Sequence, residues 1–401
     1  MLDLIGFILV GAVLGSFTGL VPGVHVNTVI IVVLSLLPVL LAHLPMHTVI
    51  AVIIAMSVVH TFVDYIPSIL LGAPMEDSVL SVLPGHQMLM EGRGYEAIRL
   101  TVLGGVGASL LGGLLLPIGI YLFPIIYSYT RASLAYILLL VLFYMVYTEG
   151  SNRKRLYALI AISYSGLFGI IVLNHYILPP KYVLFPALTG LFGISTLLTS
   201  MRSKPRIPRQ TFSYSKKMYM REIAMGSLGG MLTGLLPSMG SSQSALIIQN
   251  VMGRGERNVR KFLVAIGGVN TSNAIYALFA LYLIGNPRSG ASIAVEQILV
   301  EFGFNDLLFM LAVVLTTTFF AASITLGLSR FFIRRISSVD YSLFTKVTLA
   351  FLFILISILT GWRGLLVAAT ATSIGTSAIF AGIKRTHGMA LLMIPTIRYF
   401  L

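Results

Sequence analysis

Two short segments of this sequence place polar side chains directly after a proline within a long apolar stretch. The first segment contains Pro22, Gly23, His25, Asn27 and Thr28. The second contains Pro237, Ser238, Gly240, Ser241, Ser242 and Gln243. Serine and asparagine cap helix N-termini, where free N–H groups and the positive end of the helix dipole bind anions. Two such N-termini facing each other predict a binding site for a carboxylate or a phosphate. The alternative is that these residues only cap two short helices.

Ionisable residues lie near a second pair of positions where Gly and Pro interrupt the apolar runs. Asp64, Glu76 and Asp77 flank the first break, and Arg288 follows the second. Charged groups inside a membrane are costly and usually functional. The three acidic residues are therefore candidates for binding Na⁺ or H⁺, and Arg288 is a candidate for pairing with an anionic substrate or with Glu76 or Asp77. If these charges lie at the water interface, the cost is absent and no function follows.

A polar patch, residues 270–273, interrupts a long apolar run. Its amides and hydroxyls can coordinate Na⁺ or line a pathway, so we interpret Asn270 and Asn273 as candidate cation ligands. Hydrogen bonding between helices is the competing explanation.

Catalytic motifs are absent from the sequence. His43 and His47 have i,i+4 spacing, but Pro45 lies between them and disrupts a helix. No zinc-protease, serine-hydrolase or phosphate-loop pattern occurs. We therefore expect no enzyme activity, no metal site and no cofactor beyond Na⁺ or H⁺ as a coupling ion.

The elements that position these residues are predicted to lie in a membrane. Of the 401 residues, 57% are hydrophobic and 10% are charged, and the mean hydropathy is +0.94. The apolar runs are long and continuous, which favours helices over a barrel. The net charge of +14 does not indicate nucleic-acid binding, because basic residues cluster between apolar runs as in cytoplasmic loops. The sequence predicts an all-α, multi-pass protein of the cell membrane.

Apolar runs separated by Gly, Pro and charged residues define the expected segments. They lie at 3–21, 25–42, 46–63, 95–128, 132–148, 154–173, 183–200, 218–236, 241–253, 260–284, 305–329, 340–360, 363–382 and 386–400. The stretch 95–128 is either one long helix or two pieces. Counting partial segments, we expect about 10–12 in the membrane.

The two halves of the chain share a sequence pattern. Residues that match in order are Gly11, Gly15, Thr18, Gly19, Leu20 and Pro22 with Gly226, Gly230, Thr233, Gly234, Leu235 and Pro237. A second match pairs residues 71–74 with 284–287 at nearly the same offset. Two ordered matches indicate an internal repeat, although unrelated Gly- and Pro-rich breaks can also converge. We assign 1–200 to the first repeat, 201–217 to a basic cytoplasmic linker without further role, and 218–401 to the second repeat.

The basic residues predict that the two repeats have opposite orientations. Residues 41–45 contain no Lys or Arg, whereas the equivalent loop contains Arg254, Arg257, Arg260 and Lys261. The next pair of loops shows the reverse distribution. This is the pattern of inverted-topology repeats in secondary transporters. We interpret 3–42 and 218–253 as re-entrant hairpins in preference to pairs of full spans.

Several motifs resemble a known family. Gly19–Gly23, Pro67–Pro74, Leu83–His86 and Gly92–Ala97 are similar, in order and spacing, to the N-terminal half of the large membrane subunit of the tripartite tricarboxylate transporters, the TctA family. Gly234–Pro237 resembles that family's second-half motif. The chain departs from the family at Val24–Asn27, where a glycine-rich tip is usual, and at Ser238, where glycine is usual.

The resemblance implies a secondary active carrier for organic anions that works with a small membrane subunit and an extracytoplasmic binding protein. We therefore expect a cation-coupled, alternating-access transporter of a small carboxylate-type anion in the lipid bilayer. One alternative is a translocase of polyprenyl phosphate or another lipid phosphate. Another is a membrane scaffold without transport activity, or an intramembrane enzyme.

Overall fold

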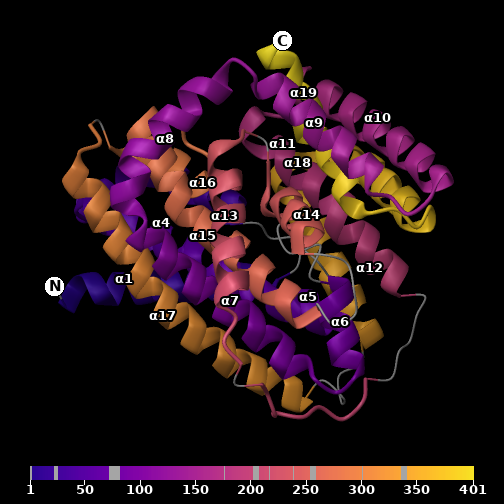
Figure 1. The fold of residues 1–401 in the computed structure, drawn as a ribbon, viewed down its shortest axis with the longest axis horizontal. Coiled ribbons are helices and arrows are strands. Elements are labelled where there is room, and N and C mark those ends of the chain that lie inside the picture. The colour runs from indigo at the N-terminus through magenta and orange to yellow at the C-terminus, as the bar shows by residue number, and fades with distance from the viewer. Residues whose placement is uncertain are drawn as a thin grey trace.

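The computed structural model describes residues 2–21, 26–71, 82–175, 177–201, 207–215, 217–237, 239–252, 259–299, 301–335 and 341–401. Throughout these ranges, every regular element is a helix (Figure 1). Eight described helices are long and apolar enough to cross a membrane, or up to nine if the bent pair α8 and α9 forms one span. The predicted all-α polytopic membrane fold is confirmed.

Helices in the first half follow the predicted apolar runs closely. Their bounds are α1 Leu2–Leu20, α2 Val26–Ser35, α3 Leu37–His43, α4 Met46–Val63, α5 Tyr65–Leu71, α6 Val82–Met90, α7 Gly94–Leu114, α8 Leu116–Arg131, α9 Leu134–Tyr147, α10 Asn152–Asn174, α11 Pro180–Leu188, the π-helical η2 Thr189–Ile194 and α12 Ser195–Ser200. The stretch 95–128 forms two pieces, since α7 ends before Leu115 and Pro117 lies in the first turn of α8.

Eight further elements lie in the described part of the second half. Their bounds are α13 Met220–Leu235, α14 Ser241–Met252, α15 Val259–Ile284, α16 Gly290–Ile298, α17 Phe304–Arg335, α18 Tyr341–Phe380, the 3₁₀ turn η5 Arg385–Met389 and, last, α19 Ala390–Phe400. Gly361 has φ +62° and kinks α18 between the two segments expected there. The sequence reasoning missed α5, α6 and α16, which are only seven, nine and nine residues long and carry polar side chains.

The helices form two bodies (Figure 1). Helices α1–α8 and α13–α17 share one large hydrophobic core, and we call them the core body. Helices α9–α12, α18 and α19 share smaller clusters, one of which also includes Leu236, Met239 and Leu246 of the α13–α14 segment, and we call these helices the outer body. Each body therefore contains elements from both halves of the sequence. Among the described residues, backbone contacts between the bodies are sparse, and the main one joins α2 to α11.

The glycines of the duplicated motif have the same packing role in both repeats. Helix α1 lies against α4, and α13 lies against α15 in the same way. A Cβ atom at Gly15 would overlap the backbone oxygen of Met56, and one at Gly230 would overlap Oγ of Ser272. Only glycine permits such close approach of two helices. This equivalence supports the internal repeat, while the opposite membrane orientation of the two copies stays a prediction.

The two repeats interlock within the core body. Helix α7 of the first half packs against α15 of the second, and α17 of the second packs against α4 of the first. Gly104 lies close to the backbone oxygen of Val264, and Gly267 lies close to that of Thr101. The halves are thus repeats in the sequence but do not form separate hydrophobic cores.

Helix lengths bear on the predicted hairpins. Helices α13 and α14 have 16 and 12 residues, shorter than the roughly 20 residues that a full span requires. In the first half, α1 has 19 residues and passes as a span, whereas α2 has only 10. These lengths favour a hairpin most clearly at α13–α14, and the re-entrant topology of both segments stays a prediction.

Part of the basic linker is tied to the core body. The amide of Thr211 donates to the Gly92 oxygen over 2.7 Å. Oε1 of Gln210 accepts from the Gly94 amide at the start of α7, and its Nε2 donates to the Leu89 oxygen, both over 2.9 Å. The expectation of a linker without further role is therefore wrong for residues 207–215, because Gln210 satisfies backbone groups where α6 ends and α7 begins.

A polar cluster fastens the C-terminal segment to the outer body. Glu149, in the α9–α10 loop, accepts hydrogen bonds from His387 Nε2 over 2.9 Å and from the Lys384 amide over 3.0 Å. Burial disfavours ionisation of Glu149, but these hydrogen bonds and the charges of His387 and Lys384 outweigh that cost. The pKa of Glu149 therefore lies below its ordinary value. The cluster joins a first-half loop to the end of the second half.

Candidate functional site

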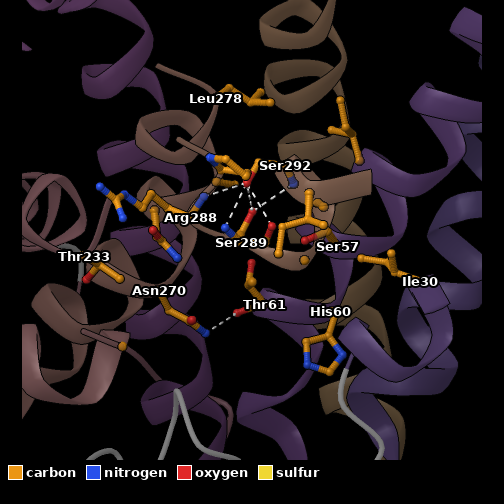
Figure 2. Close-up of a pocket in the computed structure, with 18 of the residues that line it drawn as sticks. Ile30, Ser57, His60, Thr61, Thr233, Asn270, Leu278, Arg288, Ser289 and Ser292 are labelled. Atoms are coloured by element: carbon orange, nitrogen blue, oxygen red, sulfur yellow. Dashed lines mark hydrogen bonds between the residues drawn. The ribbon is translucent and has the colours of Figure 1, made fainter. Parts of the chain in front are cut away.

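A cavity of about 800 Å³ lies between the core body and the outer body. Helices α2, α4, α15, α16 and α17 form most of its wall, together with the α13–α14 turn. On the opposite side, α11, η5 and α19 contribute Leu184, Leu188, Met389 and Leu392. Figure 2 shows the polar part of the wall, with the Ser289–Ser292 hydrogen bonds above Thr61, Asn270 and His60.

The α15–α16 loop brings Arg288 to the cavity. Gly285, with φ +61°, ends α15, and Ser289 begins α16 as its N-cap. Ser289 and Ser292 form a reciprocal capping box, and the Arg288 amide donates to Ser292 Oγ over 3.0 Å. The backbone on both sides of Arg288 is thus fixed by local hydrogen bonds.

The guanidinium of Arg288 lies over an aromatic ring. Its Cζ is 5.8 Å from the ring centroid of Tyr127, and the Tyr127 hydroxyl accepts from Asn286 Nδ2 over 3.2 Å. Nε and Nη2 of Arg288 are buried and have no hydrogen-bond partner among the described residues. These two N–H groups lie on one edge of the guanidinium, the geometry that binds both oxygens of a carboxylate.

Asn270 connects three elements. Its Oδ1 accepts from Ser241 Oγ of α14, and its Nδ2 donates to the Thr61 oxygen of α4, both over 3.3 Å. Hydrogen bonding between helices, the competing explanation for this patch, therefore accounts for Asn270. Asn273 lines the same cavity one turn further along α15, and its Oδ1 has no partner in the described chain. Asn273 is the better placed of the two to contact a ligand.

The second predicted binding segment, residues 237–243, contains residues that line the cavity and residues that lie behind its wall. Pro237 and Gly240 line the cavity. Ser241, Ser242 and Gln243 are fully buried in the first turn of α14 and are not part of the cavity wall. Gln243 Oε1 accepts from the Gly240 amide over 2.9 Å, which fixes the turn. These three residues hold the tip in place, and direct binding of substrate by any of them stays a prediction.

Asp64 lies inside the protein. It is 1% exposed at the junction of α4 and α5, within the 25-residue candidate span Met46–Leu70. It follows the cavity-lining Thr61 by one turn. Asp64 is therefore enclosed by protein, while its depth in the membrane and its role in cation coupling stay predictions.

Other predicted site residues lie outside the described residues. These are Pro22, Gly23, His25, Glu76, Asp77 and Ser238. Asn27 and Thr28 fall in the first turn of α2, but their side chains are not described.

Sequence reasoning missed His60. This residue is 3% exposed, lines the cavity, and has Nδ1 2.9 Å from Oγ1 of Thr18 in the duplicated motif. The equivalent threonine, Thr233, bonds to Ser244 over 2.7 Å and also lines the cavity. The sequence did contain an indication of this residue. The offset that aligns Leu71 with Ile284 also aligns His60 with Asn273, which was already a candidate site residue.

The sequence profile of the tripartite tricarboxylate transporter TctA family matches residues 5–390. The chain belongs to the TctA family. An uncharacterised protein of Methanocaldococcus jannaschii is similar to it, with 29% identity over 414 residues that span 100% of both chains. No solved structure matches the chain.

Membership in the TctA family confirms the resemblance seen in the motifs. The family is one of transporters, which argues against the enzyme alternative. In this TctA-family protein, both copies of the Thr-Gly-Leu-x-Pro motif lie close to one cavity, through Thr18 beside His60 and through Thr233 and Pro237 in the wall.

Proposed function

We propose that this TctA-family protein is a secondary active transporter of a small organic anion whose charged group is a carboxylate. The observation that carries the proposal is Arg288, which lines a cavity between two helical bodies and has two adjacent buried N–H groups without a partner among the described residues. Buried N–H groups of a guanidinium that lack a partner are costly, and a carboxylate is their best partner in geometry and charge.

The position of the cavity supports alternating access. Its wall comes from both bodies, and the bodies make few backbone contacts with each other elsewhere in the described chain. Rocking of the outer body against the core body would open the cavity to one side of the membrane at a time. The packed glycines keep α1 on α4 and α13 on α15 during such a motion.

We propose that polar groups next to this cavity bind the cation whose gradient drives transport. Asp64 is an acidic residue buried within a span, and Asn273 presents an unpaired amide oxygen on the wall. Carboxylate and amide oxygens are suitable ligands for Na⁺, and of these two residues Asp64 is the one that can carry H⁺. Entry of the cation with the anion would offset part of the anion's charge.

The family suggests the partners. Tripartite transporters combine a large membrane subunit with a small membrane subunit and an extracytoplasmic binding protein. We propose that this chain is the large membrane subunit of such an assembly in the cell membrane.

Uptake into proteoliposomes tests the function. We expect the wild-type protein to accumulate a labelled carboxylate when a Na⁺ or H⁺ gradient is imposed, and to stop doing so when the gradient is collapsed. Asp64→Asn should abolish gradient-driven accumulation but keep anion exchange. The matched control is Asp306→Asn, because Asp306 pairs with His47 on a surface away from the cavity.

Two results would contradict the proposal. Absence of anion uptake under either gradient, both by the chain alone and with the proposed small membrane subunit and binding protein added, would remove the transport function. Unchanged gradient dependence in Asp64→Asn would remove the role of Asp64.

A further inference from the structure

The cavity carries little positive charge. Arg288 is the one Lys or Arg in the wall formed by the described residues, and His60 is the other titratable group there. The same wall contains no Asp or Glu. Among the described wall residues an anion therefore has one permanent cation available, and a second or third carboxylate would face mainly neutral groups there. Burying unpaired charges is strongly unfavourable.

The free edge of Arg288 suits a single carboxylate. Nε and Nη2 point along one side of the planar guanidinium and together match two carboxylate oxygens. Tyr127 lies against the guanidinium, and Asn286 holds the Tyr127 hydroxyl, so the orientation of this edge is restricted. An edge of this kind binds one carboxylate at a time.

Much of the remaining wall is apolar. Leu278 of α15, Ile293 of α16 and Val314 of α17 line the core-body side. Leu188 of α11 and Leu392 of α19 face it from the outer body. Such surfaces favour a ligand whose body is apolar, since each buried apolar area contributes to affinity.

We infer that the substrate is a monocarboxylate with an apolar body, and that the site discriminates against di- and tricarboxylates. The inference rests on the proposed function, because it assigns the substrate class of the same cavity. The inference predicts that the substrate of this chain is different from the tricarboxylate after which its family is named.

Ligand binding to the purified full chain in detergent tests the inference. The probes are hexanoate, phenylacetate, succinate, citrate and the uncharged hexanamide, measured by calorimetry and by thermal shift. We expect hexanoate and phenylacetate to bind at least roughly 10-fold more tightly than succinate or citrate. Hexanamide should bind roughly 10- to 100-fold more weakly than hexanoate, because it lacks the charge that Arg288 recognises.

Variants of Arg288 connect the binding to this residue. Arg288→Gln should weaken hexanoate binding by roughly 10- to 100-fold. Arg288→Lys should give an intermediate loss, since it keeps the charge but not the two-pronged edge. The control is Arg398→Gln, which removes an exposed charge outside the cavity and should leave hexanoate binding unchanged.

The outcomes separate the inference from the proposed function. If citrate binds at least as tightly as hexanoate and its binding depends on Arg288, the monocarboxylate inference is overturned and anion transport still stands. Equal binding of hexanamide and hexanoate would also overturn the monocarboxylate inference. Absence of binding by every probe, or binding unaffected by Arg288→Gln, would overturn both. If Arg288→Gln does not fold, the comparison of probes on the wild-type chain decides the inference.

Discussion

At the scale of single residues, the amide of Asn270 joins α14, α15 and α4. Both of its polar atoms are used, one by Ser241 and one by the Thr61 backbone oxygen. Within the span, water does not replace a lost partner, so unsatisfied groups remain costly. Asn270 is therefore a positioning residue for the cavity wall that includes Thr61 and Gly240.

We predict that Asn270→Ala lowers the free energy of unfolding by about 1–3 kcal/mol, because it removes two hydrogen bonds and leaves buried partners unpaired. Uptake should fall as well, since the wall loses its link to α14. Ser241→Ala should reduce both quantities less, because it removes one of the two bonds. Thermal unfolding in detergent and proteoliposome uptake measure these effects.

Asn174 offers the matched control for that experiment. It is exposed at the end of α10, and Asn174→Ala should change the free energy of unfolding by at most about 0.5 kcal/mol. Equal stability of Asn270→Ala and Asn174→Ala would show that the two bonds, both 3.3 Å long, contribute nothing net.

At the scale of elements, the close pairs α1–α4 and α13–α15 depend on glycine at equivalent positions. Added atoms at Gly15 and Gly230 meet a backbone oxygen and a serine hydroxyl. By contrast, an added Cβ at Gly6 of α1 or at Gly327 of α17 meets nothing within 4 Å. The chain thus offers tight and open glycines for direct comparison.

We predict that Gly15→Ala and Gly230→Ala each lower the free energy of unfolding by about 1–3 kcal/mol, because the helix must move away from its neighbour. Gly6→Ala and Gly327→Ala should be neutral or stabilising by up to about 1 kcal/mol, since alanine favours helix. Thermal unfolding of the four variants measures the difference. A loss at the open positions as large as at the tight ones would contradict the packing argument.

At the scale of the whole molecule, the cavity lies between two bodies that make few backbone contacts elsewhere in the described chain. The proposed motion changes the separation of α2 and α11, the helices that approach each other across this boundary. The natural chain contains no cysteine, so introduced thiols can be labelled specifically. A covalent bridge across the boundary therefore tests the motion.

We predict that a short bis-maleimide joining cysteines in Leu34→Cys/Leu188→Cys stops uptake while the protein stays folded. Both positions line the cavity, one on each body. The two single-cysteine variants treated with the same reagent are the controls and should keep more of their uptake. Full uptake by the bridged double variant would contradict motion between α2 and α11.

The amino-acid sequence by itself determined most of the helices and the family, and it predicted the internal repeat. The predicted run 46–63 coincides with α4, and the break in 95–128 follows from Pro117. Such features are local, because apolar run length, glycine and proline act over a few neighbouring residues. The duplicated glycines were also visible, since close helix packing leaves a sequence pattern.

Only the tertiary structure decided which of the candidate residues face the cavity. The sequence pointed equally to Arg288 and Ser241, yet the first lines the wall and the second is buried behind it. His60 was overlooked because a single histidine in an apolar run carries no pattern of its own. Exposure to a shared cavity depends on how α4, α15 and the outer body pack together, and that packing joins residues more than 200 positions apart.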